Sequence, residues 1–148
     1  MLGENYEENN LKYVSDLKNK HGVYDPATGQ IQLSDLALSQ DYGWAKSTYL
    51  HERNHRLEMY PIKNQINNLS RLAKNGDEEA AETLKKIYNA SDAHSYELEL
   101  RYAAKNGLSL SQFQDIRTLY IDHCSQSDIT ANKYNYTLWQ FLKSLLLP

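Results

Sequence analysis

The run His51-Glu52-Arg53-Asn54-His55 fits the pattern H-E-x-x-H and lies in a segment from Trp44 to Tyr60 that ends at Pro61. The apolar spacing and the terminal proline are typical of a helix. Residues four apart on a helix differ by about 40° in azimuth and about 6 Å in rise, so both imidazoles can reach one tetrahedral ion. Glu52 lies about 100° round the helix, beside the place where a water would be activated. The spacing therefore predicts zinc binding by His51 and His55, with Glu52 as general base.

The segments around this helix predict an α+β fold that is mainly helical and has one small β-hairpin or sheet. Val23-Tyr24 and Gln30-Ile31-Gln32-Leu33 are short strand-like pieces, and the stretch between them has the Pro and Gly of a turn. Further elements are expected as a short turn from Ser34 to Leu38 and as helices over about 5–20, 62–72, 77–88, 91–105, 108–124 and 136–147, with a break at Asn89-Ala90-Ser91. Phe113, Ile116, Leu119 and Tyr120 are expected to face inward. No internal repeat or linker is visible, so residues 1–148 are expected to form a single domain.

Composition excludes several classes of function. The chain has 16 Lys and Arg against 19 Asp and Glu, for a net charge of −3, and no basic stripe that would bind a nucleic-acid backbone. Cys124 is the single cysteine, which excludes an internal disulfide framework and any metal site built from several cysteines. A metal must therefore be bound by His, Asp or Glu side chains.

Neither end of the chain has the pattern of a membrane or export segment. The first eight residues are acidic, whereas a secretory signal begins with basic residues and continues with apolar ones. The longest apolar run, Leu145-Leu146-Leu147, is far shorter than the roughly 20 residues of a membrane span. We expect no membrane span, and a protein that is cytoplasmic or is delivered into a target cell as part of a larger protein.

A catalytic zinc usually takes three protein ligands, so one more is needed besides the two histidines. The candidates lie in the segment from Ser91 to Ala103 and are Asp92, His94, Glu97 and Glu99. Asp92 and Glu99 share a helical face but are about 10 Å apart along the axis, so they cannot bind one ion together. Ser95 follows Asp92 by three residues, and its small side chain would allow a close approach to the helix of the two histidines. Bulky Tyr102 follows Glu99 at the same distance, and the spacing therefore favours Asp92.

Three stretches together resemble a known family: Tyr49-Leu50-His51-Glu52-x-x-His55, then Asp92-Ala93-His94-Ser95-Tyr96-Glu97-Leu98-Glu99, then Lys105-Asn106-Gly107-Leu108-Ser109. They are similar to the zincin metallopeptidase domains at the C-termini of bacterial polymorphic toxins, including Rhs-type proteins, and the resemblance covers roughly residues 23–120. In such domains, a helix after H-E-x-x-H typically bears a Glu ligand, a small residue three positions later, and an aromatic residue. Asp92, Ser95 and Tyr96 match these places, with Asp shorter than Glu by one methylene.

Membership of this family would imply a zinc-dependent hydrolase of peptide bonds that acts as a toxin effector. Its ligands would be His51, His55 and Asp92, its base Glu52, its substrate a protein or peptide, and its partner a cognate immunity protein. A neighbouring donor would stabilise the oxyanion formed from the substrate carbonyl. Five side chains could serve as that donor, and the sequence does not choose among them: His94, Tyr96, Arg101, Tyr102 and His123.

Two other classes of function compete with this interpretation. A non-catalytic helical interaction module, for instance an immunity-like protein with a coincidental H-E-x-x-H, would bind no stoichiometric metal. A metal-dependent nuclease is a third hypothesis, because Asn54-His55 near other histidines faintly resembles H-N-H chemistry. That motif needs differently spaced ligands on a hairpin and helix, and the acidic charge of this chain disfavours it.

Overall fold

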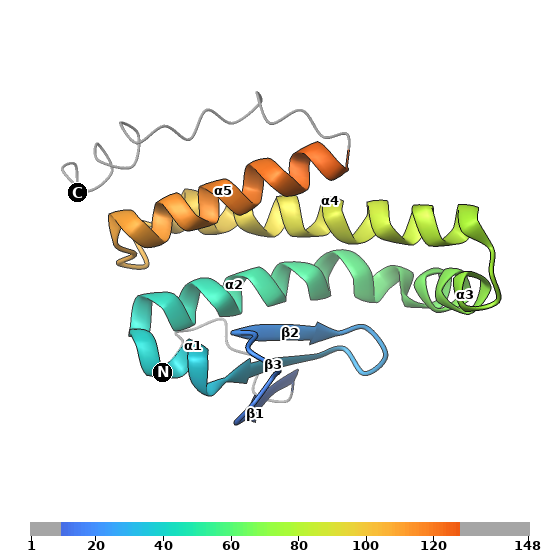
Figure 1. Ribbon diagram of the computed structural model, residues 1–148. Coiled ribbons are helices and arrows are strands. Elements are labelled where there is room, and N and C mark those ends of the chain that lie inside the picture. Colours follow the sequence, from blue (N-terminus) through green and yellow to red (C-terminus); the bar gives the residue numbers. More distant parts are fainter. Residues whose placement is uncertain (1–9, 128–148) are drawn as a thin grey trace.

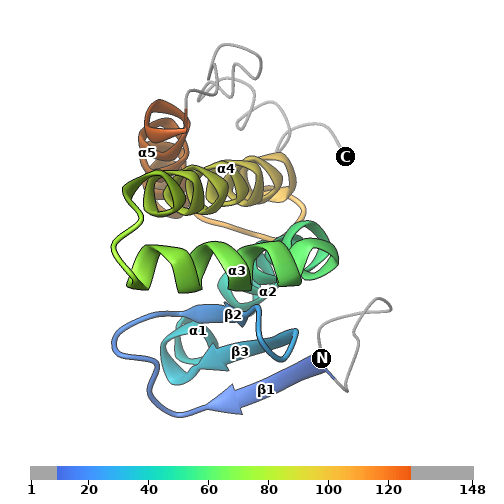
Figure 2. The same ribbon diagram turned by 90° about the vertical axis from the view of Figure 1, so that its right-hand side faces the viewer.

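The computed structural model describes residues 10–127, which form a mainly helical α+β fold with a small three-stranded sheet (Figure 1). The sheet packs on α2, α2 packs on α4, and α4 packs on α5, while α3 lies beside α4 (Figure 2). The elements are β1 (Leu11–Val14), β2 (Gly22–Asp25), β3 (Gln30–Ser34), α1 (Asp35–Gln40), α2 (Tyr42–Met59), the 3-10 turn η2 (Tyr60–Ile62), α3 (Lys63–Lys74), α4 (Glu78–Tyr102) and α5 (Leu110–Gln126). The predicted fold class is confirmed at this level.

The predicted hairpin is confirmed as the antiparallel pair of β2 and β3, in which Tyr24 lies opposite Ile31. Its turn is held by Asp25, whose carboxylate accepts from the Ala27 N–H at 2.9 Å and from the Thr28 hydroxyl at 2.7 Å. Gly29 completes the turn with a φ of 73°, a conformation that glycine adopts without strain. The sheet order is β1-β3-β2, so β2 is an edge strand, and it packs on α2.

The helix expected over residues 5–20 is wrong for the part that the structure describes. Leu11 to Val14 form strand β1, which pairs in parallel with β3, and Leu11 packs against the buried cluster of Ile31, Leu33 and Tyr49. After the strand, Lys18 and Asn19 have φ angles of 54° and 66°, which a right-handed helix excludes. Pairing with β3 therefore outweighs the local preference for a helix that the spacing of the apolar residues indicates. The helix expected over 136–147 lies outside the described residues.

The break expected at Asn89-Ala90-Ser91 is also wrong, because α4 continues without interruption for 25 residues. Asp77 is the N-cap residue of this helix, and its carboxylate accepts from the Ala80 N–H at 2.9 Å. Asn89 and Ser91 could interrupt a helix only if their side chains bonded to nearby backbone. Instead, Asn89 bonds to His123 on α5 and Ser91 bonds to His55 on α2, so both side chains join helices to one another.

The largest hydrophobic cluster lies between α4 and α5 and consists of Ala93, Leu100, Ala103, Leu108, Phe113, Ile116, Tyr120 and Cys124. The expected inward direction of Phe113, Ile116 and Tyr120 is confirmed, whereas Leu119 is 42% exposed. Ser109 and Gln112 form a reciprocal capping box at the start of α5, which fixes where that helix begins. No helix within residues 10–127 is both long enough and apolar enough to cross a bilayer.

We predict that Gly43→Ala destabilises the fold, because a Cβ at this position would lie 2.2 Å from the backbone oxygen of Asn106. Relieving such a contact with backbone should cost about 1–3 kcal/mol of the free energy of unfolding, measured by urea denaturation. Tyr42→Ala is the control, since Tyr42 is the neighbouring residue on α2 and is 52% exposed. Equal stability of the two variants would contradict the close approach of α2 to the Asn106 backbone.

Candidate metal centre

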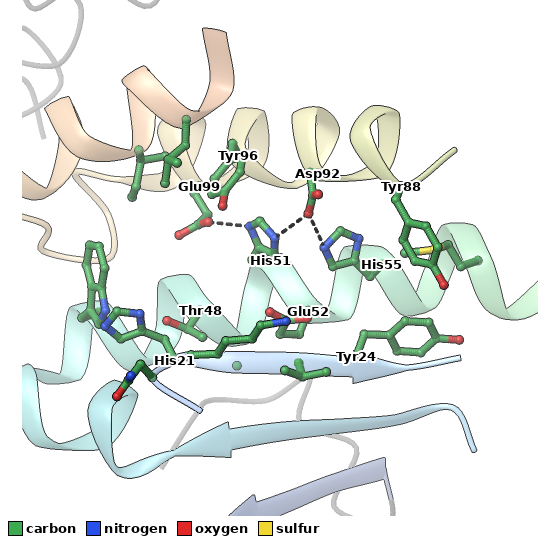
Figure 3. A pocket seen from close by; sticks show the side chains of 18 residues that line it. His21, Tyr24, Thr48, His51, Glu52, His55, Tyr88, Asp92, Tyr96 and Glu99 are labelled. Carbon is green, nitrogen blue, oxygen red and sulfur yellow. Dashed lines mark hydrogen bonds and ion pairs between the residues drawn. The ribbon is translucent and has the colours of Figure 1, made fainter. Parts of the chain in front are cut away.

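Helices α2 and α4 bring three of the predicted site residues together: His51, His55 and Asp92 (Figure 3). The Oδ1 atom of Asp92 lies 3.5 Å from Nε2 of His51 and 3.1 Å from Nε2 of His55. One ligand atom from each residue lies within 4.8 Å of the others, and both histidines are buried. A single cation between these three atoms could therefore contact all of them.

Small residues on α4 allow this approach of the two helices. Ser95 is fully buried, Ala93 is 1% exposed, and the Ser95 hydroxyl accepts a hydrogen bond of 3.0 Å from the Asn54 amide on α2. The helices run antiparallel, since Ser47 near the start of α2 bonds to Glu99 near the end of α4. The expectation that Ser95 permits close contact beside Asp92 agrees with this packing.

Each histidine has a second partner at Nδ1, the ring nitrogen that faces away from Asp92. Nδ1 of His51 lies 2.7 Å from a Glu99 oxygen, and the other Glu99 oxygen accepts from the Ser47 hydroxyl. Nδ1 of His55 lies 2.8 Å from the Ser91 hydroxyl. A carboxylate only accepts, so Glu99 fixes the Nδ1 hydrogen of His51 and leaves Nε2 as the atom available to a cation. Glu99 thus orients a candidate ligand and does not contact the shared position itself.

The charges of the cluster favour a cation. Burial lowers the pKa of His51, but hydrogen bonds to Asp92 and Glu99 outweigh burial and raise that pKa to about 10. Burial raises the pKa of Asp92, and hydrogen bonds from His51 and His55 outweigh it, so the pKa of this carboxyl falls well below its usual range. The site therefore stabilises positive charge between an ionised carboxylate and two imidazoles, and a metal ion would compete with the proton for Nε2 of His51.

Glu52 is 7% exposed and lies on the side of α2 that faces β2, apart from the three-residue cluster. Its carboxylate accepts a hydrogen bond from the Tyr24 backbone N–H, and burial raises its pKa while His51 and His55 lower it, with a net increase. Gly22 makes room for it, because a Cβ there would lie 2.9 Å from Cγ of Glu52. Glu52 is thus available to take up a proton beside the candidate ligands.

A cavity of about 510 Å³ opens onto this cluster and is lined by residues of β2, α2, α4 and α5. Tyr96 is the one residue of the five candidate donors that lines it, with its ring centroid 4.5 Å from that of His51. Burial and the surrounding carboxylates raise the pKa of Tyr96, so its hydroxyl remains a donor. His94 instead pairs with Glu58 at 2.8 Å, and Arg101 pairs with Glu97 at 2.6 Å.

His123, another of the five candidate donors, reaches the outer side of the cluster from α5, and its contact with Asp92 was not predicted from the sequence. Its Nδ1 lies 2.9 Å from Oδ1 of Asn89 and 3.6 Å from Oδ2 of Asp92. Its ring centroid lies 5.4 Å from that of Tyr96. His123 therefore borders the carboxylate oxygen of Asp92 that the two α2 histidines do not contact.

The sequence did not indicate the supporting roles of Ser47, Ser91 and Glu99, since Ser91 was expected to interrupt the helix and Glu99 was a candidate ligand. A signal for them exists in the spacing, because Ser47, His51 and His55 recur every four residues on α2, and Ser91, Ser95 and Glu99 do so on α4. All six are buried. Polar residues that recur at the helical period on two buried faces indicate side chains that satisfy one another across the interface.

Comparisons with known proteins do not assign a family to this chain. No family model, curated protein or solved structure matches it. What the site does is therefore inferred from the geometry and chemistry of its own residues.

We predict that Asp92→Asn weakens zinc binding more than Glu99→Gln does. Asp92 would lose a charged ligand atom, whereas Glu99 would lose an orienting contact, for which a reduction of about 10- to 100-fold in metal affinity is usual. The measurement is zinc affinity in competition with a chelator, in the same buffer for both variants. A loss of affinity in Glu99→Gln alone would show that Asp92 is not a ligand.

Proposed function

We propose that this chain is a zincin-like, zinc-dependent metallopeptidase that hydrolyses a peptide bond. The observation that carries the proposal is the convergence of His51 and His55 Nε2 on Asp92 Oδ1, with Glu52 separate from these ligands and beside the cavity. A structural zinc site usually has four protein ligands, whereas a catalytic site has three and one open position. His51, His55 and Asp92 would be three protein ligands, which is the number typical of a catalytic site.

The donor set suits zinc among the common metals. Two imidazole nitrogens and one carboxylate oxygen are ligands that zinc accepts, whereas calcium and magnesium prefer oxygen alone. When bound, zinc supplies a Lewis acid that lowers the pKa of a water and polarises a substrate carbonyl. The Nδ1 contacts of both histidines favour this use of the site, because they hold the rings with Nε2 directed at the shared position.

Glu52 acts as the general base in this proposal. Its carboxylate takes a proton from the attacking water and passes it to the leaving amine nitrogen, so the same group serves as base and then as acid. Burial raises the pKa of Glu52, which strengthens it as a base near neutral pH. The Tyr24 N–H holds the carboxylate in place between the edge strand and the candidate ligands.

Tyr96 donates a hydrogen bond to the carbonyl oxygen as negative charge develops on it. It is the cavity-lining member of the five candidate donors, and its raised pKa keeps the hydroxyl protonated. A donor held in place before the reaction stabilises the developing charge without reorganisation. The packing of Tyr96 against both His51 and His123 restricts its ring.

The edge strand suggests how a protein or peptide substrate would bind. β2 lies at the edge of the sheet, and Gly22, Val23 and Tyr24 of this strand line the cavity. An extended peptide can bind beside an exposed edge strand through backbone hydrogen bonds. The resemblance of the motif segments to polymorphic-toxin domains supports the further proposal of a toxin effector with a cognate immunity protein.

The proposal predicts that Glu52→Gln keeps zinc and loses activity. Glutamine fills the same volume but cannot accept the proton, so cleavage of a general protein substrate such as casein should fall by at least about 100-fold. Zinc content and thermal unfolding are measured on the same sample. Glu82→Gln is the matched control, because Glu82 is exposed on α4. Full activity of Glu52→Gln would exclude Glu52 as the base, and a zinc-loaded wild type without any cleavage would favour a non-catalytic module.

A second expectation concerns the oxyanion. Tyr96→Phe removes one hydroxyl and should lower kcat by about 100-fold with little change in zinc affinity or KM, because the lost hydrogen bond forms in the transition state. Tyr102→Phe, at a residue that is 38% exposed on the same helix, is the control and should retain the kcat of the wild type. An unchanged kcat in Tyr96→Phe would assign the donor role to another group.

A further inference from the structure

The cavity differs between its two ends along the direction of β2 and α2. His21, Thr48 and Glu99 lie at one end, where the Trp44 ring also lines the cavity beside His21, and Tyr24 and Tyr88 lie at the other, with the candidate ligands between them (Figure 3). Met59 also lines the cavity and packs against Tyr24 in a buried cluster. We call the end formed by Tyr24, Met59 and Tyr88 the aromatic end.

The aromatic end begins one helical turn beyond the candidate ligands on both helices. Met59 follows His55 by four residues on α2, and Tyr88 precedes Asp92 by four residues on α4. The two helices run antiparallel, so both steps lead in the same direction, and each covers about 6 Å. A side chain on the residue next to the cleaved bond would span that distance. The aromatic end is therefore placed to contact the side chain of a substrate residue that adjoins the reacting carbonyl.

The side chains of the aromatic end differ in how firmly they are held. Met59 and Tyr24 are 2% and 6% exposed and pack with Ile66, so they form a fixed wall. Tyr88 is 36% exposed. Burial raises the pKa of both tyrosines, so their hydroxyls remain uncharged at neutral pH. All three side chains at this end are thus neutral, and one ring is within reach of a ligand.

We infer that the aromatic end is a side-chain pocket that selects peptides with an aromatic residue next to the cleaved bond, an assignment that rests on the proposed peptidase function. The exposed ring of Tyr88 offers an edge-to-face contact, and Tyr24 and Met59 complete a neutral wall, so this end favours an aromatic guest over an aliphatic one. A charged guest would lose its hydration against these three neutral side chains.

The first test measures binding and needs no turnover. The probes are the hydroxamates of phenylalanine and glycine, which share a zinc-binding group and differ in the side chain, titrated into the zinc-loaded protein by calorimetry. We expect the phenylalanine probe to bind about tenfold more tightly to the wild type, in the range that an apolar pocket gives. The ratio of the affinity for the phenylalanine probe to that for the glycine probe should fall to near one in Tyr88→Glu and in Tyr88→Ala. Tyr102→Glu is the matched control, since Tyr102 is 38% exposed on the same helix and does not line the cavity, and it should keep the tenfold ratio.

The second test measures where the enzyme cuts. Unfolded proteins are digested, and the residues on both sides of each new terminus are identified by mass spectrometry. Phe, Tyr and Trp should be enriched next to the cuts made by the wild type and by Tyr102→Glu, and Tyr88→Glu should shift the preference by about tenfold towards Lys and Arg.

The outcomes separate the pocket from the peptidase function. The pocket assignment would be wrong if the wild type bound the two probes equally. It would also be wrong if both Tyr88 variants kept the tenfold higher affinity for the phenylalanine probe. Cleavage without aromatic enrichment would overturn the substrate assignment and leave the peptidase function intact. A clear preference for the phenylalanine probe without any cleavage would overturn the peptidase function, and with it the substrate assignment, while the pocket would stand as a ligand site.

Discussion

The contact on which the rest of this structure depends is the buried polar interface between α2 and α4. Ser47 bonds to Glu99, Asn54 bonds to Ser95, and each of the two histidines bridges Asp92 and a second partner. Buried polar groups are costly unless each finds a partner, so a shift of either helix by one residue would leave several of them unsatisfied. The interface therefore fixes the register of the two helices, and with it the distance between His51, His55 and Asp92.

This constraint also separates the chemical roles within one short motif. His51 and His55 face α4, whereas Glu52 faces β2, where Gly22 makes room for its carboxylate and the Tyr24 N–H bonds to it. The small sheet thus has a part in the site although it contributes no candidate ligand. α5 adds His123 on the outer side of Asp92 and packs the core that supports α4. The candidate ligands and the candidate base consequently project in different directions from a single helical turn and line the same cavity.

Sequence reasoning could predict what depends on local spacing. It found the hairpin, the helix of the two histidines and the proximity of Asp92, which follows from the helical period and from the small side chain of Ser95. It failed where distant contacts outweigh local preference: Leu11 to Val14 pair with β3 and form a strand, and Asn89 and Ser91 bond across helices and do not interrupt α4. The orienting role of Glu99 required the antiparallel register, which no single segment specifies.

Zinc content of the purified chain tests the central claim most directly. Elemental analysis of the wild type should give about one zinc per chain, and His51→Ala and His55→Ala should both lose it, since each removes one of three ligands. His94→Ala is the matched control, because His94 lies on α4 outside the cluster and its side chain is half exposed, and it should retain the metal. A folded wild type that takes up no zinc, and whose thermal stability is unchanged by added zinc, would contradict the metal centre.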